Sequence, residues 1–304
     1  MTSLNKFKNE PVNYTAEIRQ MMHGFGDCAN PLLESAKIIE DVVLQQMRAI
    51  VKKACEGATR RGNRMIGQED FIFLMRKDKV KVQRLLKYLE IKEMKSTMSK
   101  TAQPNLDEDV TGFEGSDLVY VKPRRPCHEF IELIDNTGEL LENRTSYDIV
   151  KQNRLIRAEM ITRKMDEIQY AKYCKARHAS FTNKQWHKFS DWICPEDDLK
   201  ITKSGYLILG YLAYETVAQI VDLALLVRHD QNKIHGDAIK RLKFNHCNPY
   251  TYKPYQQNMG VVIKAISPSE INEALRRYWS PQLDMTGPFH RTSMRPIHPK
   301  LLAC

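Results

Sequence analysis

Three polar side chains interrupt the most apolar stretch of the chain, between Tyr206 and Val227. Glu215, Gln219 and Asp222 follow one another at helical spacing, so they form one polar stripe on an otherwise apolar helix. Such a stripe can face solvent, or it can bind a basic partner through complementary charge. Within the stripe, Glu215 is the first choice for a partner contact because it interrupts the run LILGYLAYE.

A second group with binding chemistry is the basic loop from Arg60 to Arg64, RRGNR. Arginine side chains and backbone amides in such a loop can contact DNA phosphates, and Arg60 and Arg61 are the candidate phosphate contacts. The alternative is structural, because cations are favourable at the C-terminus of the preceding helix. The pattern therefore permits a weak DNA contact without requiring one.

No catalytic motif is found along the sequence. The spacings of a Walker phosphate loop, of Gly-x-Ser-x-Gly, of Gly-x-Gly-x-x-Gly and of His-Glu-x-x-His are all missing. The pairs Cys127-His128 and His246-Cys247 each offer two metal ligands, but neither has a second pair at suitable spacing. We therefore expect no enzyme activity, no metal, no cofactor and no small-molecule substrate.

Trp186, Phe189 and Trp192 recur at every third residue. Aromatic side chains at this spacing either pack in a core around a loop or offer flat surfaces for a ligand or nucleobase. We favour the core interpretation, because buried aromatic clusters are common.

The elements that position these residues follow a pattern that the chain carries twice. Each copy has a short helix, a helix of roughly 27 residues, a short extended segment and a second short helix. We expect these helices at 14–23, 32–58 and 68–75, and again at 166–174, 203–228 and 268–279. Aligning Ile66 with Ile266 places Asp70 opposite Glu270. Short, long, short is the helix order of a histone fold, a unit that cannot bury its long helix alone.

Two helix starts are especially well marked. Asn30-Pro31 places an N-cap acceptor before a proline that loses no hydrogen bond in the first turn. Ser267-Pro268-Ser269-Glu270 adds a glutamate at the third helical position, which completes a capping box.

The charge distribution divides the chain into modules. The 304 residues carry a net charge of +10, with residues 101–145 contributing −6. We therefore predict a first histone fold with a C-terminal helix at 14–95 and an acidic linker at 96–146. A second fold at 147–290 follows, with a preceding basic helix at about 147–165 and an insertion after its long helix. Within the linker, 117–121 and 130–134 are candidate short strands, and after Pro281 we expect a loosely ordered tail.

Cysteine usage and hydropathy indicate the compartment. The seven cysteines include no Cys-x-x-Cys pair, and the first twenty residues contain no apolar signal region, so we expect a reducing compartment. The apolar run from Tyr206 to Val227 is long enough for a membrane span, but two acids near its centre would cost roughly 5–7 kcal/mol. We interpret this segment as a buried central helix and expect no membrane association.

Four segments resemble the SPT-three (suppressor of Ty) transcription initiation family of the SAGA coactivator. They are YTAEIRQMMHGFGD, DFIFLMRKDKVKVQRLLKYL, ARHASFT with FSDWI, and LILGYLAYETV. The resemblance covers roughly 14–95 and 147–280. It implies an all-α protein with two tandem histone folds that pair head to tail within one chain. It also implies a nuclear, non-enzymatic subunit that binds the TATA-box-binding protein, helps deliver it to promoters and contacts other subunits of the complex.

The resemblance also suggests roles for individual residues. It makes Glu215, Gln219 and Asp222 candidates for contact with the TATA-box-binding protein. Ordinary histones place an arginine three residues before the strand's Ile or Val, whereas this chain has Asn63 there and Arg64 one step later. The expected structural lock is therefore Arg64 with Asp70. The alternative function is a histone-like module that binds duplex DNA directly.

Overall fold

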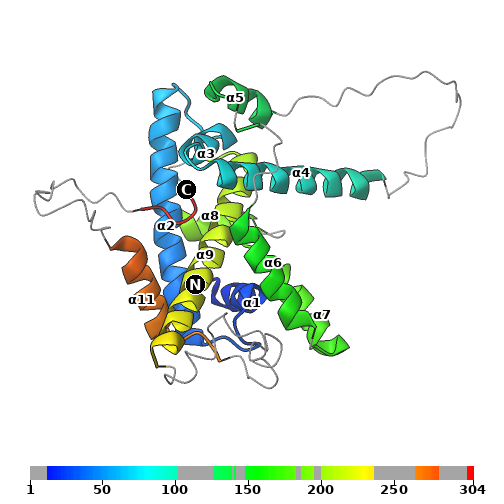
Figure 1. The fold of residues 1–304 in the computed structure, drawn as a ribbon. Helices are drawn as coiled ribbons and strands as arrows, with labels where there is room; N and C mark the ends of the chain where they lie inside the picture. The colour runs from blue at the N-terminus through cyan, green and yellow to red at the C-terminus, as the bar shows by residue number, and fades with distance from the viewer. Residues whose placement is uncertain are drawn as a thin grey trace, which may run out of the picture. The chain divides into compact units, whose positions relative to one another are not determined.

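The structure is a computed structural model that describes residues 12–101, 126–138, 140–141, 148–163, 165–182, 186–194, 200–235, 264–280 and 300–304. Within these ranges every regular element is an α-helix, which confirms the all-α prediction (Figure 1). In chain order the helices are α1 (Thr15–Phe25), α2 (Leu33–Arg60), α3 (Gln68–Met75), α4 (Lys79–Thr101), α5 (Pro126–Ile134), α6 (Ile149–Thr162), α7 (Glu167–Arg177), α8 (Trp186–Ile193), α9 (Lys203–His235) and α11 (Pro268–Trp279).

The described residues belong to two compact units. Unit 1 takes those within 1–52, 149–199 and 209–303, and unit 2 takes those within 53–148 and 200–208 together with Cys304. In unit 1, α1 packs against α7 and α6. The core of unit 1 consists of aliphatic and methionine side chains that are almost fully buried, among them Ile18, Met22, Ile39, Val43, Met47, Leu212, Val217, Val221 and Ile271.

In unit 1, the loop between α1 and α2 binds the segment that leads into α11. The Ile266 backbone N–H donates to Oδ1 of Asp27 over 2.9 Å, and the Ser35 hydroxyl donates to the Ile266 carbonyl over 2.6 Å. Ile266 itself is buried. Both polar groups of this backbone unit are thus satisfied by side chains of the first copy, as buried backbone requires.

In unit 2, Ile66 pairs with the segment that leads into α9. The Ile66 N–H donates to the Lys200 carbonyl over 2.9 Å, and the Thr202 N–H donates to the Ile66 carbonyl over 3.0 Å. These bonds form an isolated parallel bridge between Ile66 and Ile201. The brief strand expected around Ile66 is therefore a single bridging residue.

Both copies hold their last short helix with the same arrangement of charge. In unit 2, Asp70 accepts from the Gly67 backbone N–H and pairs with the Arg61 guanidinium at 2.6 Å. In unit 1, Glu270 accepts from the Ser267 backbone N–H at 2.8 Å and pairs with Arg228 at 2.7 Å. Asp70 and Glu270, which the sequence repeat aligns, therefore make equivalent bonds. Each accepts from a backbone N–H and pairs with an arginine.

The partner of Asp70 differs from the sequence expectation. Arg61 reaches the carboxylate, with Nε on Oδ1 at 3.1 Å, whereas Arg64 is exposed in the loop. Gly62, at a φ of 73°, lies in the turn that follows α2, and its N–H donates to the Thr59 carbonyl. This turn follows Arg61 directly, which leaves that arginine beside the start of α3.

Several expected boundaries differ from the structure. Residues 130–134, a candidate strand, lie in helix α5, and α4 continues to Thr101, past the expected linker start at 96. The other candidate strand, at 117–121, lies outside the described residues, as do the segments 236–263 and 281–299. The capping box at Ser267 is confirmed, since its hydroxyl accepts from the Glu270 N–H.

The last described residues of the predicted tail pack against unit 1. Leu302 is fully buried, and its N–H donates to Oε1 of Gln46 in α2 over 3.0 Å. The Tyr278 hydroxyl of α11 donates to the Leu301 carbonyl over 2.9 Å. Residues 300–303 are therefore ordered by contacts with α2 and α11, contrary to the loose tail expected after Pro281.

Helix α9 is long and apolar enough by composition to cross a membrane, over Lys203–Gln231. However, 67% of its most apolar window is buried within the protein, and Glu215 and Asp222 interrupt it. These features are typical of the core helix of a globular protein. The structure thus supports the interpretation of this segment as a central helix.

The two carboxylate locks differ in the bonding and exposure of their arginines. Arg228 also donates to the Lys264 and Ala265 carbonyls, and its pair with Glu270 is mostly buried, whereas the Arg61 side chain is 35% exposed. We predict that Arg228→Ala lowers the free energy of unfolding by about 3 kcal/mol. Arg61→Ala should lower it by less, about 2 kcal/mol, because Asp70 is buried but the Arg61 side chain is the more exposed of the two arginines. Urea denaturation followed by circular dichroism measures both, and equal losses would contradict this ranking.

Asp27 makes stability depend on pH. Its side chain is 1% exposed, no described residue bonds to Oδ2, and burial raises the pKa of its carboxyl. A raised pKa in the folded state means that stability falls as pH rises through that pKa. Asp27→Asn keeps the Oδ1 acceptor for Ile266 and removes the charge. We predict that the variant gains stability relative to the parent at pH 7, and that this gain shrinks toward pH 4. A gain that does not vary with pH would refute the assignment.

Candidate functional site

The acidic stripe of α9 lies under helix α6. Arg154 of α6 binds both carboxylates, with Nε 2.7 Å from Asp222 and Nη1 3.0 Å from Glu215. Arg157 forms a second ion pair with Asp222. The side chains of Glu215 and Asp222 are only 15% and 23% exposed. The stripe is thus neither a solvated face nor an open charged surface, because α6 covers it and neutralises it.

The charges in this cluster stabilise one another. Burial opposes the charge of Arg154, but the nearby Glu215 and Asp222 outweigh that effect and raise the pKa of its guanidinium. An arginine fork suits this position because it can bond two carboxylates at once. Gln219 is half-buried on the same face, between the two acids in sequence. The two acids therefore lie beneath a pair of arginines, and Gln219 lies on the same face of α9 between them.

The two glycines of the segment HGFGD, Gly24 and Gly26, leave space for α7 and for a side chain of α6 close to the end of α1. A Cβ at Gly24 would lie 3.3 Å from the backbone of Ala176 in α7, and the Tyr173 hydroxyl donates to the Gly24 carbonyl over 3.2 Å. A Cβ at Gly26 would lie 2.7 Å from Cδ of Arg157. Gly26 also has a φ of 119°, which disfavours any L side chain. The end of α1 is therefore shaped to receive both α7 and Arg157.

An aromatic contact supports the ion pairs from the side. The rings of Phe25 and Tyr214 lie 4.8 Å apart, and the Arg154 guanidinium lies 5.7 Å from the Phe25 ring. Burial raises the pKa of Tyr214 to about 12, so its hydroxyl stays neutral at physiological pH. These contacts join the end of α1 to α6 and α9 within unit 1.

The predicted aromatic group lies mainly in the core of unit 1. Phe189 and Trp192 are buried in α8 and pack against Tyr14, at ring-centroid distances of 6.1 and 5.0 Å. Phe181 stacks on Trp192 at 5.8 Å, whereas Trp186 is 39% exposed. The core interpretation holds for Phe189 and Trp192, which pack from a helix and not from the loop that the spacing suggested.

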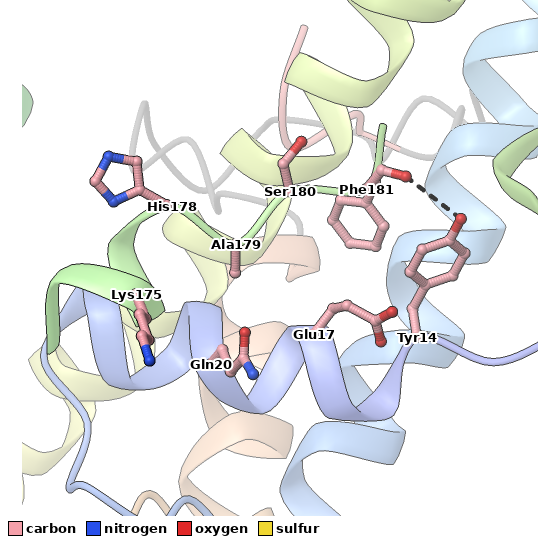
Figure 2. Close-up of a pocket in the computed structure, with 8 residues that line it drawn as sticks. All are labelled: Tyr14, Glu17, Gln20, Lys175, His178, Ala179, Ser180 and Phe181. Carbon is pink, nitrogen blue, oxygen red and sulfur yellow. Dashed lines mark hydrogen bonds between the residues drawn. The ribbon is translucent and has the colours of Figure 1, made fainter. Parts of the chain in front are cut away.

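A polar hollow of about 370 Å³ lies beside this cluster, between α1 and the segment that follows α7 (Figure 2). Tyr14 forms one wall, and its hydroxyl donates to the Phe181 carbonyl over 3.3 Å. Glu17, which faces the hollow, is already paired with Lys188 at 3.0 Å. The remaining lining residues are Gln20, Lys175, His178, Ala179 and Ser180.

The arginines of the basic loop after α2 have different roles. Arg61 is engaged with Asp70, while Arg60 and Arg64 are exposed. Of the two predicted phosphate contacts, Arg60 therefore lies at the surface and Arg61 belongs to a structural lock. Within the part of the chain that the structure describes, no group of three or more His, Cys, Asp or Glu side chains could hold a metal ion.

Sequence reasoning missed the cations that complete these sites. Arg154 and Arg157 belong to a segment predicted as a basic helix, but nothing in their spacing identified α9 as their partner. Arg228 was likewise not connected with Glu270. One signal was available in the sequence. A carboxylate in an apolar helix requires a nearby cation, so the acids of α9 required a basic segment as their partner.

Comparisons with known proteins agree with the helical architecture. The family model of transcription initiation factor IID, 18 kDa subunit, matches residues 12–104. The chain is 32% identical to the SAGA complex subunit Spt3 of Schizosaccharomyces pombe, over 74% of this chain and 76% of that protein.

Further relatives extend the comparison. The SAGA complex subunit Spt3 of Drosophila melanogaster is 31% identical, over 88% of this chain and 68% of that protein. The transcription initiation factor TFIID subunit 13 of Arabidopsis thaliana is 38% identical, over 26% of this chain and 62% of that protein. At this identity and coverage, the chain belongs to the family of the SAGA complex subunit Spt3.

Proposed function

We propose that this protein is a non-enzymatic subunit of a SAGA-type transcription coactivator in the nucleus. In this role it binds the TATA-box-binding protein and promotes its delivery to promoters for initiation by RNA polymerase II. The observation that carries the proposal is the similarity to Spt3 subunits over most of the chain. A helical core on which α6 is held by ion pairs suits a protein that acts by binding other proteins.

We propose that the two copies are tandem histone folds that pair head to tail, at 14–95 and 147–290, joined by the acidic linker at 96–146. Two loop contacts support this pairing, and each lies within a single unit. Asp27, before the long helix of the first copy, bonds Ile266, after the long helix of the second. Ile66, after the first long helix, bridges Ile201, before the second. A linker can supply effective concentrations on the order of mM for such a pair.

This pairing predicts the mass of the isolated protein in solution. We expect the full chain to elute as a monomer of 35.4 kDa in size-exclusion chromatography with light scattering. Asp27→Ala removes the side-chain acceptor of Ile266, and Ile66→Ala removes buried side-chain packing beside the backbone bridge, so both should lower the unfolding temperature. A stable parent dimer at micromolar concentration would argue instead for pairing between chains.

We propose that the polar stripe of α9 contributes to binding of the TATA-box-binding protein by holding α6 in place. The stripe consists of Glu215, Gln219 and Asp222. Both carboxylates are engaged by α6 arginines and mostly covered, which favours this positioning role over direct contact. Removing one partner of such a cluster leaves an uncompensated charge. The binding surface would then depend on the stripe through the position of α6.

Substitutions at Glu215 separate positioning from direct charge contact. Glu215→Lys places a cation against Arg154, so we predict a lower unfolding temperature and loss of the TATA-box-binding protein in a pull-down. Glu215→Gln keeps an acceptor for Arg154, and Asp222 continues to hold the same arginine. We predict that this variant retains binding within about threefold, a difference below 1 kcal/mol.

The parent chain and the folding measurements control this experiment. Glu215→Gln that loses binding with an unchanged unfolding temperature would instead show that the carboxylate contacts the partner directly. A parent chain that fails to retain the TATA-box-binding protein would refute the proposed function itself.

Direct binding of duplex DNA is the second candidate function, and exposure of Arg60 at the end of α2 favours it. The neighbouring Arg61 is already paired with Asp70, which reduces the charge available to a phosphate. Duplex binding by a few such contacts would be weak and strongly salt-dependent. The adaptor function therefore remains the leading proposal.

A further inference from the structure

Residues 300–303, which we call the clasp, bond to both copies of the helical pattern within unit 1. The Leu302 N–H donates to Oε1 of Gln46 in α2 over 3.0 Å, and the Gln46 side chain is buried. One residue earlier, the Leu301 carbonyl accepts from the Tyr278 hydroxyl of α11 over 2.9 Å. The clasp therefore joins the long helix of the first copy to the last helix of the second.

Both the main chain and the side chains of the clasp are engaged. The Lys300 carbonyl accepts from Nε1 of Trp279 over 3.4 Å. Leu302 is fully buried, and Leu301 and Ala303 are buried beside it in sequence. A peptide segment bound through main-chain hydrogen bonds takes its specificity from the sites that receive its side chains. Docking of the clasp therefore depends most on the buried side chain of Leu302.

The two ends of α11 are attached to unit 1 in different ways. At its start, Glu270 pairs with Arg228, and both side chains are mostly buried. The apolar side of the helix then packs in the core as far as Leu275, which is the last buried residue of α11. The final turn, residues 276–279, thus lies beyond both the ion pair and the buried stripe.

The final turn of α11 has two other attachments. Arg277 pairs with Asp230 of α9 at 2.8 Å, but these side chains are 40% and 36% exposed, so solvent weakens the pair. Tyr278 and Trp279 bond the clasp, whose three last residues are buried. The clasp is therefore the better shielded of the two attachments.

We propose that the clasp is a detachable strap that fixes the final turn of α11 to α2. When it is docked, residues 276–279 are tied to the first copy. When it is released, this turn opens, while α1, α7 and the start of α11 keep their structure. Such local opening is possible because residues 281–299 separate the clasp from α11 in sequence, so the two are not one continuous helix. The inference goes beyond the proposed function, because it involves neither the TATA-box-binding protein nor another subunit.

Hydrogen exchange of the full chain, followed by mass spectrometry, tests the strap. Leu302→Asp places a charge in a buried site and should release the clasp. We expect the amides of residues 276–279 to exchange about tenfold faster or more, with exchange in α1 and α7 unchanged. Leu33→Asp, at a position on α2 that is 51% exposed, is the matched control and should change neither region. Unchanged exchange in 276–279 of the Leu302→Asp variant would overturn the proposal.

A second variant separates release of the clasp from a general loss of stability. Ile18→Ala removes buried packing in α1 and should speed exchange throughout α1 and α7. If Leu302→Asp gave this same broad pattern, the clasp would be an ordinary part of the core and the proposal would be wrong.

Gln46→Ala tests the connection from the side of α2. It removes the acceptor of the Leu302 N–H and changes no residue of α11 or of the clasp. We expect exchange in 276–279 to rise about threefold, since one hydrogen bond is lost. Combined with Leu302→Asp, Gln46→Ala should add nothing, because the clasp is already released. An additive rise would show that Gln46 acts on α11 without the clasp and would refute the proposal.

Discussion

Compensation of buried carboxylates is the constraint on which the structure depends. Glu215 and Asp222 lie on a helix that is otherwise apolar, and removing them from water is favourable only because Arg154 meets both. The same requirement appears at the short helices, where Asp70 and Glu270 each satisfy a backbone N–H and an arginine. Charge pairing therefore fixes α6 on α9 and fixes the last short helix of each copy.

Close backbone approach is the second constraint, and it acts at the end of α1. Gly24 allows the backbone of α7 to come near, and Gly26 leaves space for Arg157. These glycines belong to YTAEIRQMMHGFGD, one of the four segments that resemble the SPT-three family. This segment therefore has a structural role. It ends α1, and it lets two other helices of unit 1 pack close to that end.

Local patterns predicted the helices well, and tertiary contacts explain what they could not predict. The spacing of apolar residues located α1, α2, α9 and α11, and the capping box at Ser267 formed as expected. The arginine partners were not predictable in this way, because they depend on which segments meet after folding. Arg61 and Arg64 both lie close before Asp70 in sequence, and the turn at Gly62 leaves Arg61 as the one that reaches the carboxylate. The stripe was located correctly, but its covering by α6 required the three-dimensional arrangement.

The attachment of α6 through its arginines has a consequence for how this helix can change during evolution. Its arginines hold the fold, whereas Ile149, Ile156 and Met160 bury little surface within the protein. Most binding surfaces trade stability against function, because the same residues serve both. In α6 the residues that hold the helix and the residues that face solvent lie on different sides, so selection can alter the solvent side by single substitutions at almost no cost in folding free energy. Related proteins can therefore diverge on the solvent side of α6 while keeping the helix in the same place.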